Sequence, residues 1–224
     1  MVRLVHDKYP WLGPIIFVSS ALYFFAQIAV AWVYRPSYSV VLNPISDLGN
    51  TSCSPYGGHD VCSPRHALMN VTFVLLGIVM GSGSTLLYQE FSERRRPERV
   101  AAFVGFLCMG IAGVGTVLVG IYPENANHAV HVTGAALAIG VGNLGIFILG
   151  AVLSLPESMR RYMVLFSTVS VTALILFASH RSFGIGDGTM ERIAAYPETV
   201  WLITFGLYVW RFRPKDDPVQ SAES

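Results

Sequence analysis

The sequence predicts an all-α fold, a bundle of six transmembrane helices that forms a single membrane domain over residues 1–224. Hydrophobic residues make up 53% of the chain and charged residues 13%, and the mean hydropathy is +0.51. Apolar stretches of about 20 residues, the length that crosses a bilayer as a helix, recur six times. They lack the alternation of a β-barrel, so helices must satisfy their backbone groups in lipid. We expect helices over residues 14–34, 67–88, 100–122, 130–153, 162–179 and 196–210.

The basic residues predict the orientation of this bundle. With a cytoplasmic N-terminus, the inner segments hold eleven of the 15 basic residues: Arg3, Lys8, Arg94, Arg95, Arg96, Arg99, Arg160, Arg161, Arg211, Arg213 and Lys215. The outer segments hold four: Arg35, Arg65, Arg181 and Arg192. Because cytoplasmic loops carry the excess of Lys and Arg, both termini are expected inside. The expected location is the cell membrane, in a prokaryote the plasma membrane.

The segments outside the apolar stretches differ in length and character. The inner connections are short, whereas the first outer loop spans about thirty residues, from Arg35 to His66. In the third outer loop, residues 189–195 are expected to form a short surface helix from which Arg192 extends toward the membrane interface. The polar tail, residues 215–224, is expected to be disordered. Short inner and elaborate outer loops suggest that any chemistry faces outward.

The three cysteines favour a structural disulfide. Cys53 and Cys62 lie nine residues apart in the first outer loop, where two intervening glycines allow a turn and the compartment permits disulfides. A thiol oxidoreductase would need a further cysteine pair, but the third cysteine, Cys108, lies alone in an apolar stretch. A zinc site made of the two loop cysteines with His59 is the remaining alternative; otherwise His59 is expected to be solvated.

Glycines recur along the apolar stretches. Gly77 and Gly81 form a GxxxG pattern, and Gly110, Gly113 and Gly115 follow in the next stretch. Small residues let helix backbones approach closely. We favour tight packing within the chain over a dimer interface.

Polar residues gather at the expected outer boundary. His128 and His131 are three residues apart, so a helix places both on one face. Asp47 lies in the segment NPISDLGN, where a carboxylate beside lipid needs a partner, a ligand or a polar cavity. With His180 at the end of another stretch, these residues could form a zinc first shell with an open position for water.

The same cluster suggests catalytic roles. Zinc would activate a water molecule and polarise a carbonyl or phosphoryl oxygen. Asp47, Ser46 and His131 are the expected catalytic residues, His128, His131, Asp47 and His180 the expected metal ligands, and Ser46 or Glu124 could relay protons. The alternatives are interfacial hydrogen bonding for the histidines and, for Asp47, helix capping or a pair with Arg65 or Arg181.

The chain resembles the membrane family called domain of unknown function 998 (DUF998). The resemblance rests on NPISDLGN and the following ALMN helix start within Leu42–Asn70, and on the YPEN…H pattern of Tyr122–His131. It implies a bacterial or archaeal protein with about six helices, distantly similar to Frag1-type proteins, some of which act in lipid remodelling. It nominates Ser46, Asp47 and His131 without supplying a reaction.

A looser likeness is to the intramembrane hydrolases that include alkaline ceramidases and progestin/adiponectin-type receptors. Those proteins carry a Ser, an Asp and three His around zinc on transmembrane helices. This chain offers the same residue types but has HxxH in place of HxxxH and its Asp47 in a loop. The likeness is an analogy of site, not of fold.

Three functions remain open from the sequence. The first is a metal-assisted hydrolase or transferase that acts on a lipid or lipid-linked substrate at the outer leaflet, with membrane lipids as partners. The others are a non-enzymatic scaffold or accessory subunit and a small transporter. The net charge of +1 argues against a nucleic-acid partner. A transporter needs polar midplane residues, and those expected there are not ionisable: Gln27, Thr72, Thr116, Asn143, Ser170 and Thr172.

Overall fold

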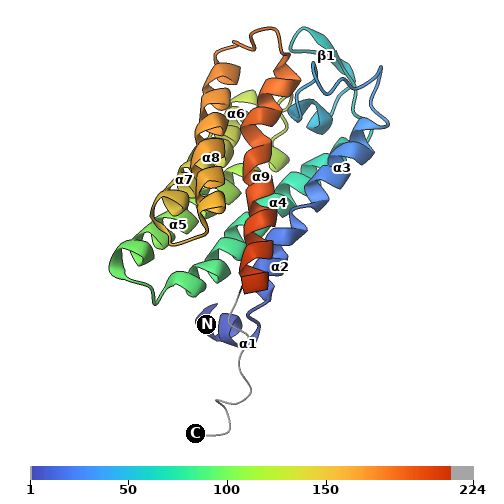
Figure 1. Ribbon diagram of the computed structural model, residues 1–224. Helices are drawn as coiled ribbons and strands as arrows, with labels where there is room; N and C mark the ends of the chain where they lie inside the picture. Colours follow the sequence, from blue (N-terminus) through green and yellow to red (C-terminus); the bar gives the residue numbers. More distant parts are fainter. Residues whose placement is uncertain (1, 213–224) are drawn as a thin grey trace, which may run out of the picture.

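The structure, a computed structural model, is an all-α helical bundle and describes residues 2–212 (Figure 1). The expected disordered tail, residues 215–224, lies outside the described residues. The helices are α1 (Val2–Lys8), α2 (Leu12–Ser19), α3 (Leu22–Ala31), α4 (His66–Leu87), α5 (Arg96–Ile121), α6 (His128–Ala135), α7 (Gly142–Val152), α8 (Glu157–Ala178) and α9 (Asp187–Phe212). Within the described part, five stretches are long and apolar enough to cross a membrane: Leu12–Ala31, His66–Phe91, Arg96–Ile121, His128–Val152 and Glu157–Ala178.

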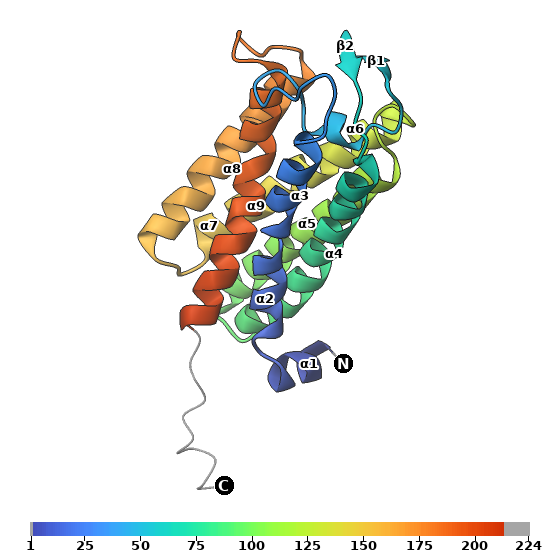
Figure 2. The ribbon, with the colours of Figure 1, turned by 90° about the vertical axis from the view of Figure 1, so that its right-hand side faces the viewer.

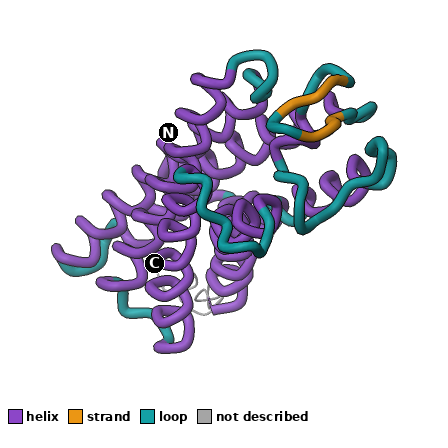
Figure 3. Tube along the Cα trace, turned by 90° about the horizontal axis from the view of Figure 1, so that it is seen from above, coloured by secondary structure: helices purple, strands orange, loops and turns teal. Residues whose placement is uncertain are grey.

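The two ends of the bundle differ. Figure 2 shows α1 and the last turn of α9 at the same end, as the sequence predicts for an even number of passages. The opposite end is formed by residues 32–65, 122–127 and 179–186, and we call it the hairpin end. Figure 3 shows how small its two strands are beside the helices. The excess of basic residues at the other end predicts that the hairpin end faces outward.

The first apolar stretch is interrupted. α2 ends at Ser19 and α3 begins at Leu22. At the break, the hydroxyls of Ser19 and Ser20 donate to the carbonyls of Ile16 and Phe17, both at 2.6 Å. Such local bonds compete with the helical hydrogen-bond ladder, which accounts for the difference from the continuous helix expected over residues 14–34.

The last helix differs most from the prediction. A helix over 196–210 and a separate surface helix over 189–195 were expected, but α9 is continuous from Asp187 to Phe212. α9 packs along α8 and α2. It is not among the five apolar candidates, because its first half carries Glu191, Arg192 and Glu198. Their burial inside the bundle compensates for the low hydropathy of this half.

Glycine contacts join the central helices. A Cβ built on Gly113 of α5 would lie 2.6 Å from the carbonyl oxygen of Gly77 in α4. A Cβ on Gly115 would lie 2.5 Å from the carbonyl oxygen of Gly134 in α6. These backbones therefore touch where a larger residue could not fit. The expected tight packing within the chain is confirmed.

Candidate functional site at the hairpin end

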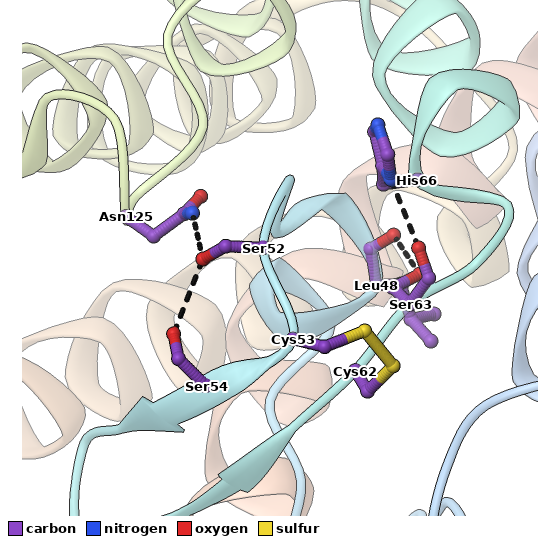
Figure 4. Close-up of a disulfide and its surroundings, with 8 residues drawn as sticks. All are labelled: Leu48, Ser52, Cys53, Ser54, Cys62, Ser63, His66 and Asn125. Carbon is purple, nitrogen blue, oxygen red and sulfur yellow. Dashed lines mark hydrogen bonds between the residues drawn. A yellow bond between two sulfur atoms is a disulfide. The ribbon is translucent and has the colours of Figure 1, made fainter.

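The hairpin end contains a short β-hairpin that is closed by a disulfide. β1 (Ser54–Tyr56) pairs antiparallel with β2 (His59–Val61), and Tyr56 lies opposite His59. The turn uses Gly57 and Gly58 at φ +60° and +86°, a conformation that glycine adopts without steric cost. The predicted Cys53–Cys62 disulfide is present, with a Cα–Cα distance of 4.1 Å (Figure 4). It closes the base of the hairpin and fixes where Tyr56 and His59 lie.

Polar contacts anchor the base of the hairpin to two neighbouring segments. Ser63 Oγ donates to the Leu48 carbonyl at 2.7 Å, and Asn125 Nδ2 donates to Ser52 Oγ at 3.0 Å (Figure 4). Leu48 belongs to the 3₁₀ turn η1 (Ser46–Gly49), and Asn125 to the α5–α6 loop. The hairpin, η1 and this loop are thus held as one layer.

Asp47 is the buried centre of this layer. Its side chain is 1% exposed, and its Oδ2 lies 2.7 Å from His59 Nε2 and accepts from Asn43 Nδ2 at 3.1 Å. His59 was expected to be solvated, but it caps the carboxylate from the hairpin. The expected alternative pairs with Arg65 and Arg181 are not formed. A loop histidine therefore satisfies the carboxylate that the sequence nominated.

The predicted zinc ligands have other partners. The exposed His128 lies with Nδ1 2.9 Å from the Tyr56 hydroxyl, and the buried His131 lies with Nδ1 2.9 Å from the Tyr122 carbonyl oxygen. His180 is exposed after the end of α8 at φ +53°. In residues 2–212, no three His, Cys, Asp or Glu side chains are arranged to hold a metal ion. The arrangement brings His131 to the cavity described below, but it does not bring the four expected ligands together.

Ser46 and Glu124 meet beneath the hairpin. The buried Ser46 hydroxyl and Asn50 Nδ2 both hydrogen-bond the Glu124 carboxyl, the latter at 3.1 Å. Burial raises the pKa of Glu124 to about 8, and the nearby carboxylates of Asp47 and Glu191 add to the increase. Glu124 is therefore protonated at neutral pH and can donate a proton.

Glu124 is expected to make stability depend on pH. Its pKa rises from 4.5 in the unfolded chain to about 8 in the folded protein, so between these values only the unfolded chain releases the proton. Stability should fall by up to about 5 kcal/mol as pH rises through this window and level off above it. Glu124→Gln should flatten the dependence of Tm on pH in detergent. Asp60→Asn, an exposed hairpin change, should leave it intact; an unchanged slope in Glu124→Gln would refute the assignment.

Arg192 connects α9 to the first loop. Its Nη1 donates to the carbonyls of Val40, Asn43 and Gly188 at 2.9, 3.0 and 2.7 Å, and its Nη2 donates to the Tyr38 hydroxyl. The residue is 7% exposed. The expected extension of Arg192 to the membrane interface is therefore wrong. Its two Nη atoms donate to four acceptors, whereas its buried Nε has no partner among the described residues.

A cavity of about 60 Å³ lies under η1 and extends toward the middle of the bundle. Its polar lining comes from Ser46, His131, Glu191 and Glu198, with the hydroxyls of three further residues. The remaining wall is apolar. The lining residues are Tyr23, Ile45, Ser46, Phe73, Leu76, Met80, Thr116, Val119, His131, Ala135, Ala138, Ile139, Glu191, Ala195, Glu198 and Thr199. The polar groups thus face hydrocarbon-like walls across a small space.

A π-helical stretch forms part of this wall. The helix expected over 130–153 spans 128–152 as α6, a π-helix at Ala136–Val141 (η3) and α7. Ala138 and Ile139 of η3 line the cavity. π-helical turns widen a helix locally and are frequent at functional sites.

Sequence reasoning gave no role to three residues of the site. Tyr56 donates to the Glu124 carbonyl at 3.1 Å, and its position follows from the Gly-Gly turn beside it. Glu191 and Glu198 are seven residues apart, so one continuous helix places them on one face. Their spacing could be recognised only by expecting a helix that begins before Glu191, whereas the predicted helix began at residue 196.

These observations define the class of protein: a multi-pass, membrane-embedded helical bundle with a polar site covered by a disulfide-closed hairpin. Its particular family follows from comparison. The model of the family described as protein of unknown function (DUF998) matches residues 17–208, and the chain belongs to this family. No curated protein and no solved structure matches the chain significantly.

Proposed function

We propose that this protein binds a lipid or lipid-linked substrate in the cavity under η1 and acts on its polar group as a hydrolase or transferase. The observation that carries the proposal is the lining of this cavity, where Ser46, His131 and Glu191 face an apolar wall. Substrate sites are mostly apolar cavities with a few convergent polar groups. The proposal includes the outward orientation of the hairpin end and a prokaryotic plasma membrane.

The polar groups suggest a division of roles. Glu124, protonated at neutral pH and hydrogen-bonded to Ser46, is suited to act as a general acid through that hydroxyl. The imidazole of His131, oriented by the Tyr122 carbonyl, is suited to act as the base that activates water or a hydroxyl group. Asp47, held by His59 of the hairpin, fixes the position of η1 beside them.

The zinc site remains a prediction. His128 and Asp47 already have hydrogen-bond partners on the hairpin, so the expected four-ligand set does not fit this arrangement and no step above uses a metal. Elemental analysis of protein purified without chelator is its direct measurement.

The test is lipid turnover by the purified protein in mixed micelles, followed by mass spectrometry. His131→Ala and Ser46→Ala should each reduce turnover at least 100-fold, because proton transfer contributes about 10²–10⁴-fold. Ser54→Ala is the matched exposed control. His128→Ala should keep most activity if no zinc is used and lose it if His128 is a ligand. Equal turnover in wild type and His131→Ala would refute the proposal.

A second candidate function, a small transporter, is favoured by the position of one residue. Ionisable midplane residues were not expected, but the long α9 carries Glu198 near its middle. Membrane-embedded carboxyls are common in substrate and ion pathways. Uptake by proteoliposomes that depends on Glu198, without lipid turnover, would favour this function.

A further inference from the structure

Glu198 is a buried carboxyl with one oxygen that no described residue satisfies. It is 5% exposed, and among residues 2–212 its Oε1 has no hydrogen-bond partner. It lies near the middle of α9 and beside Gly142, itself near the middle of the His128–Val152 stretch. A carboxyl at this depth is costly unless something satisfies it. A hydrophobic residue at this position would make the bundle more stable.

A glycine of the neighbouring helix lies against this carboxyl. A Cβ built on Gly142 would overlap the Glu198 carboxyl where it now lies, and the end of this side chain would have to move. The side chain lines the cavity under η1. An unpaired buried carboxyl oxygen therefore lies at the wall of a cavity, which is the arrangement of a ligand-binding site.

The charges around the cavity define what could bind. The titratable groups in its lining are Glu191 and Glu198 from α9, His131 from α6 and Tyr23 from α3. Among the described residues no lysine or arginine lines it, and the donors of Arg192 point to the loop at residues 38–43 and to Gly188. Glu191 already accepts from the Ile45 amide. The free acceptor is therefore Glu198, and an anionic group would be repelled.

We propose that the cavity binds the ammonium group of a primary aliphatic amine, with Glu198 as its counter-ion. An ammonium offers three donors, one for the Glu198 carboxyl and two for hydroxyl oxygens of the lining such as those of Thr116 and Thr199. The first carbons of its chain would contact Phe73, Leu76 and Met80.

The head group sets the selectivity. A primary ammonium carries three N–H donors for the oxygens around the cavity, whereas a trimethylammonium carries none. The inference rests on the proposed function in assigning this ammonium to the lipid or lipid-linked substrate; a free amine of the same chemistry would bind in the same way.

The experiment measures ligand binding by calorimetry and thermal shift, with protein in nanodiscs of phosphatidylcholine. n-Butylammonium should bind and raise Tm, whereas tetramethylammonium, butanol and butyrate should not. Glu198→Gln should weaken butylammonium binding at least tenfold and keep or raise the Tm of the free protein, because it removes a buried acid. Glu157→Gln, at an exposed carboxyl on the other end of the bundle, is the matched control.

The source of the amine is tested in the same assay. If a lipid headgroup is the ligand, phosphatidylethanolamine in the nanodisc should compete with butylammonium; if a free amine is, it should not. Equal binding of butylammonium and tetramethylammonium by wild type, or unchanged binding by Glu198→Gln, overturns the proposal. The ligand series on wild type decides the matter even if the variant does not fold. Amine binding without lipid turnover would refute only the proposed function, and turnover without amine binding would refute only this inference.

Discussion

Arg192→Ala is expected to lower the free energy of unfolding by about 3 kcal/mol, because it removes hydrogen bonds from a buried charged donor and such bonds contribute about 1.5–3 kcal/mol each. The substitution removes the side-chain donor of the Val40 carbonyl and one of two donors of the Asn43 carbonyl, which still accepts from the Tyr38 hydroxyl. It also removes the guanidinium that lies 5.4 Å from the centre of the Tyr38 ring. The loop at residues 38–43 should then detach from α9 and expose η1.

Two further variants distinguish the loss of these hydrogen bonds from the loss of the positive charge. Arg192→Lys keeps the charge but cannot reach four acceptors at once, so an intermediate loss is expected. Arg181→Ala, an exposed arginine at the same end of the bundle, should change little. Thermal unfolding in detergent gives the ranking, and proteolysis of residues 32–65 reports the loop. A similar Tm for Arg192→Ala and Arg181→Ala would contradict the role assigned to Arg192.

The helices and the disulfide could be predicted because their signals are local. An apolar run long enough to span a bilayer identifies a helix whatever it packs against, and α4 at His66–Leu87 lies within one residue of the expected 67–88. The Cys53–Cys62 pair follows from a short separation with glycines between. Neither inference needed a partner from elsewhere in the chain.

The first half of α9 could not be predicted because its signal is not local. Charged residues in a sequence indicate a solvated loop unless their partners are known. The partners of Arg192 lie about 150 residues away, at Val40 and Asn43. Once these contacts form, the charge is compensated inside the bundle and the helix continues through it. Glu198, expected at the start of a helix, moves to the middle for the same reason.

The candidate site divides in the same way. A buried, satisfied Asp47 could be expected, since a carboxylate near lipid requires a partner. Helical spacing placed His128 and His131 on one face, but spacing does not identify what each ring contacts. Tyr56 and His59 reach the site through the hairpin turn, and a turn's docking position is set by tertiary contacts. Residue types could thus be nominated from the sequence, while their pairing could not.

Gly113→Leu is expected to destabilise the bundle by more than about 3 kcal/mol, because overpacking by a single added group already costs about 1–3 kcal/mol. Even the Cβ of Gly113→Ala would lie 2.6 Å from the Gly77 carbonyl oxygen and 3.1 Å from the Gly81 nitrogen. α4 and α5, the pair with the most extensive contact, would have to move apart. The cavity wall carries Met80 of α4 and Thr116 of α5, so ligand binding should weaken together with Tm.

The matched control lies one turn away on the same helix. A Cβ on Gly110 meets nothing within 4 Å, so Gly110→Ala should be neutral or stabilise by up to about 1 kcal/mol through helix propensity. The two alanine variants therefore predict opposite signs of the change in Tm, although the chemical change is identical. If Gly110→Ala lowered Tm as much as Gly113→Ala, the face of α5 that carries Gly110 would have to contact another chain. The close contact between α4 and α5 would then not explain why these positions are glycine.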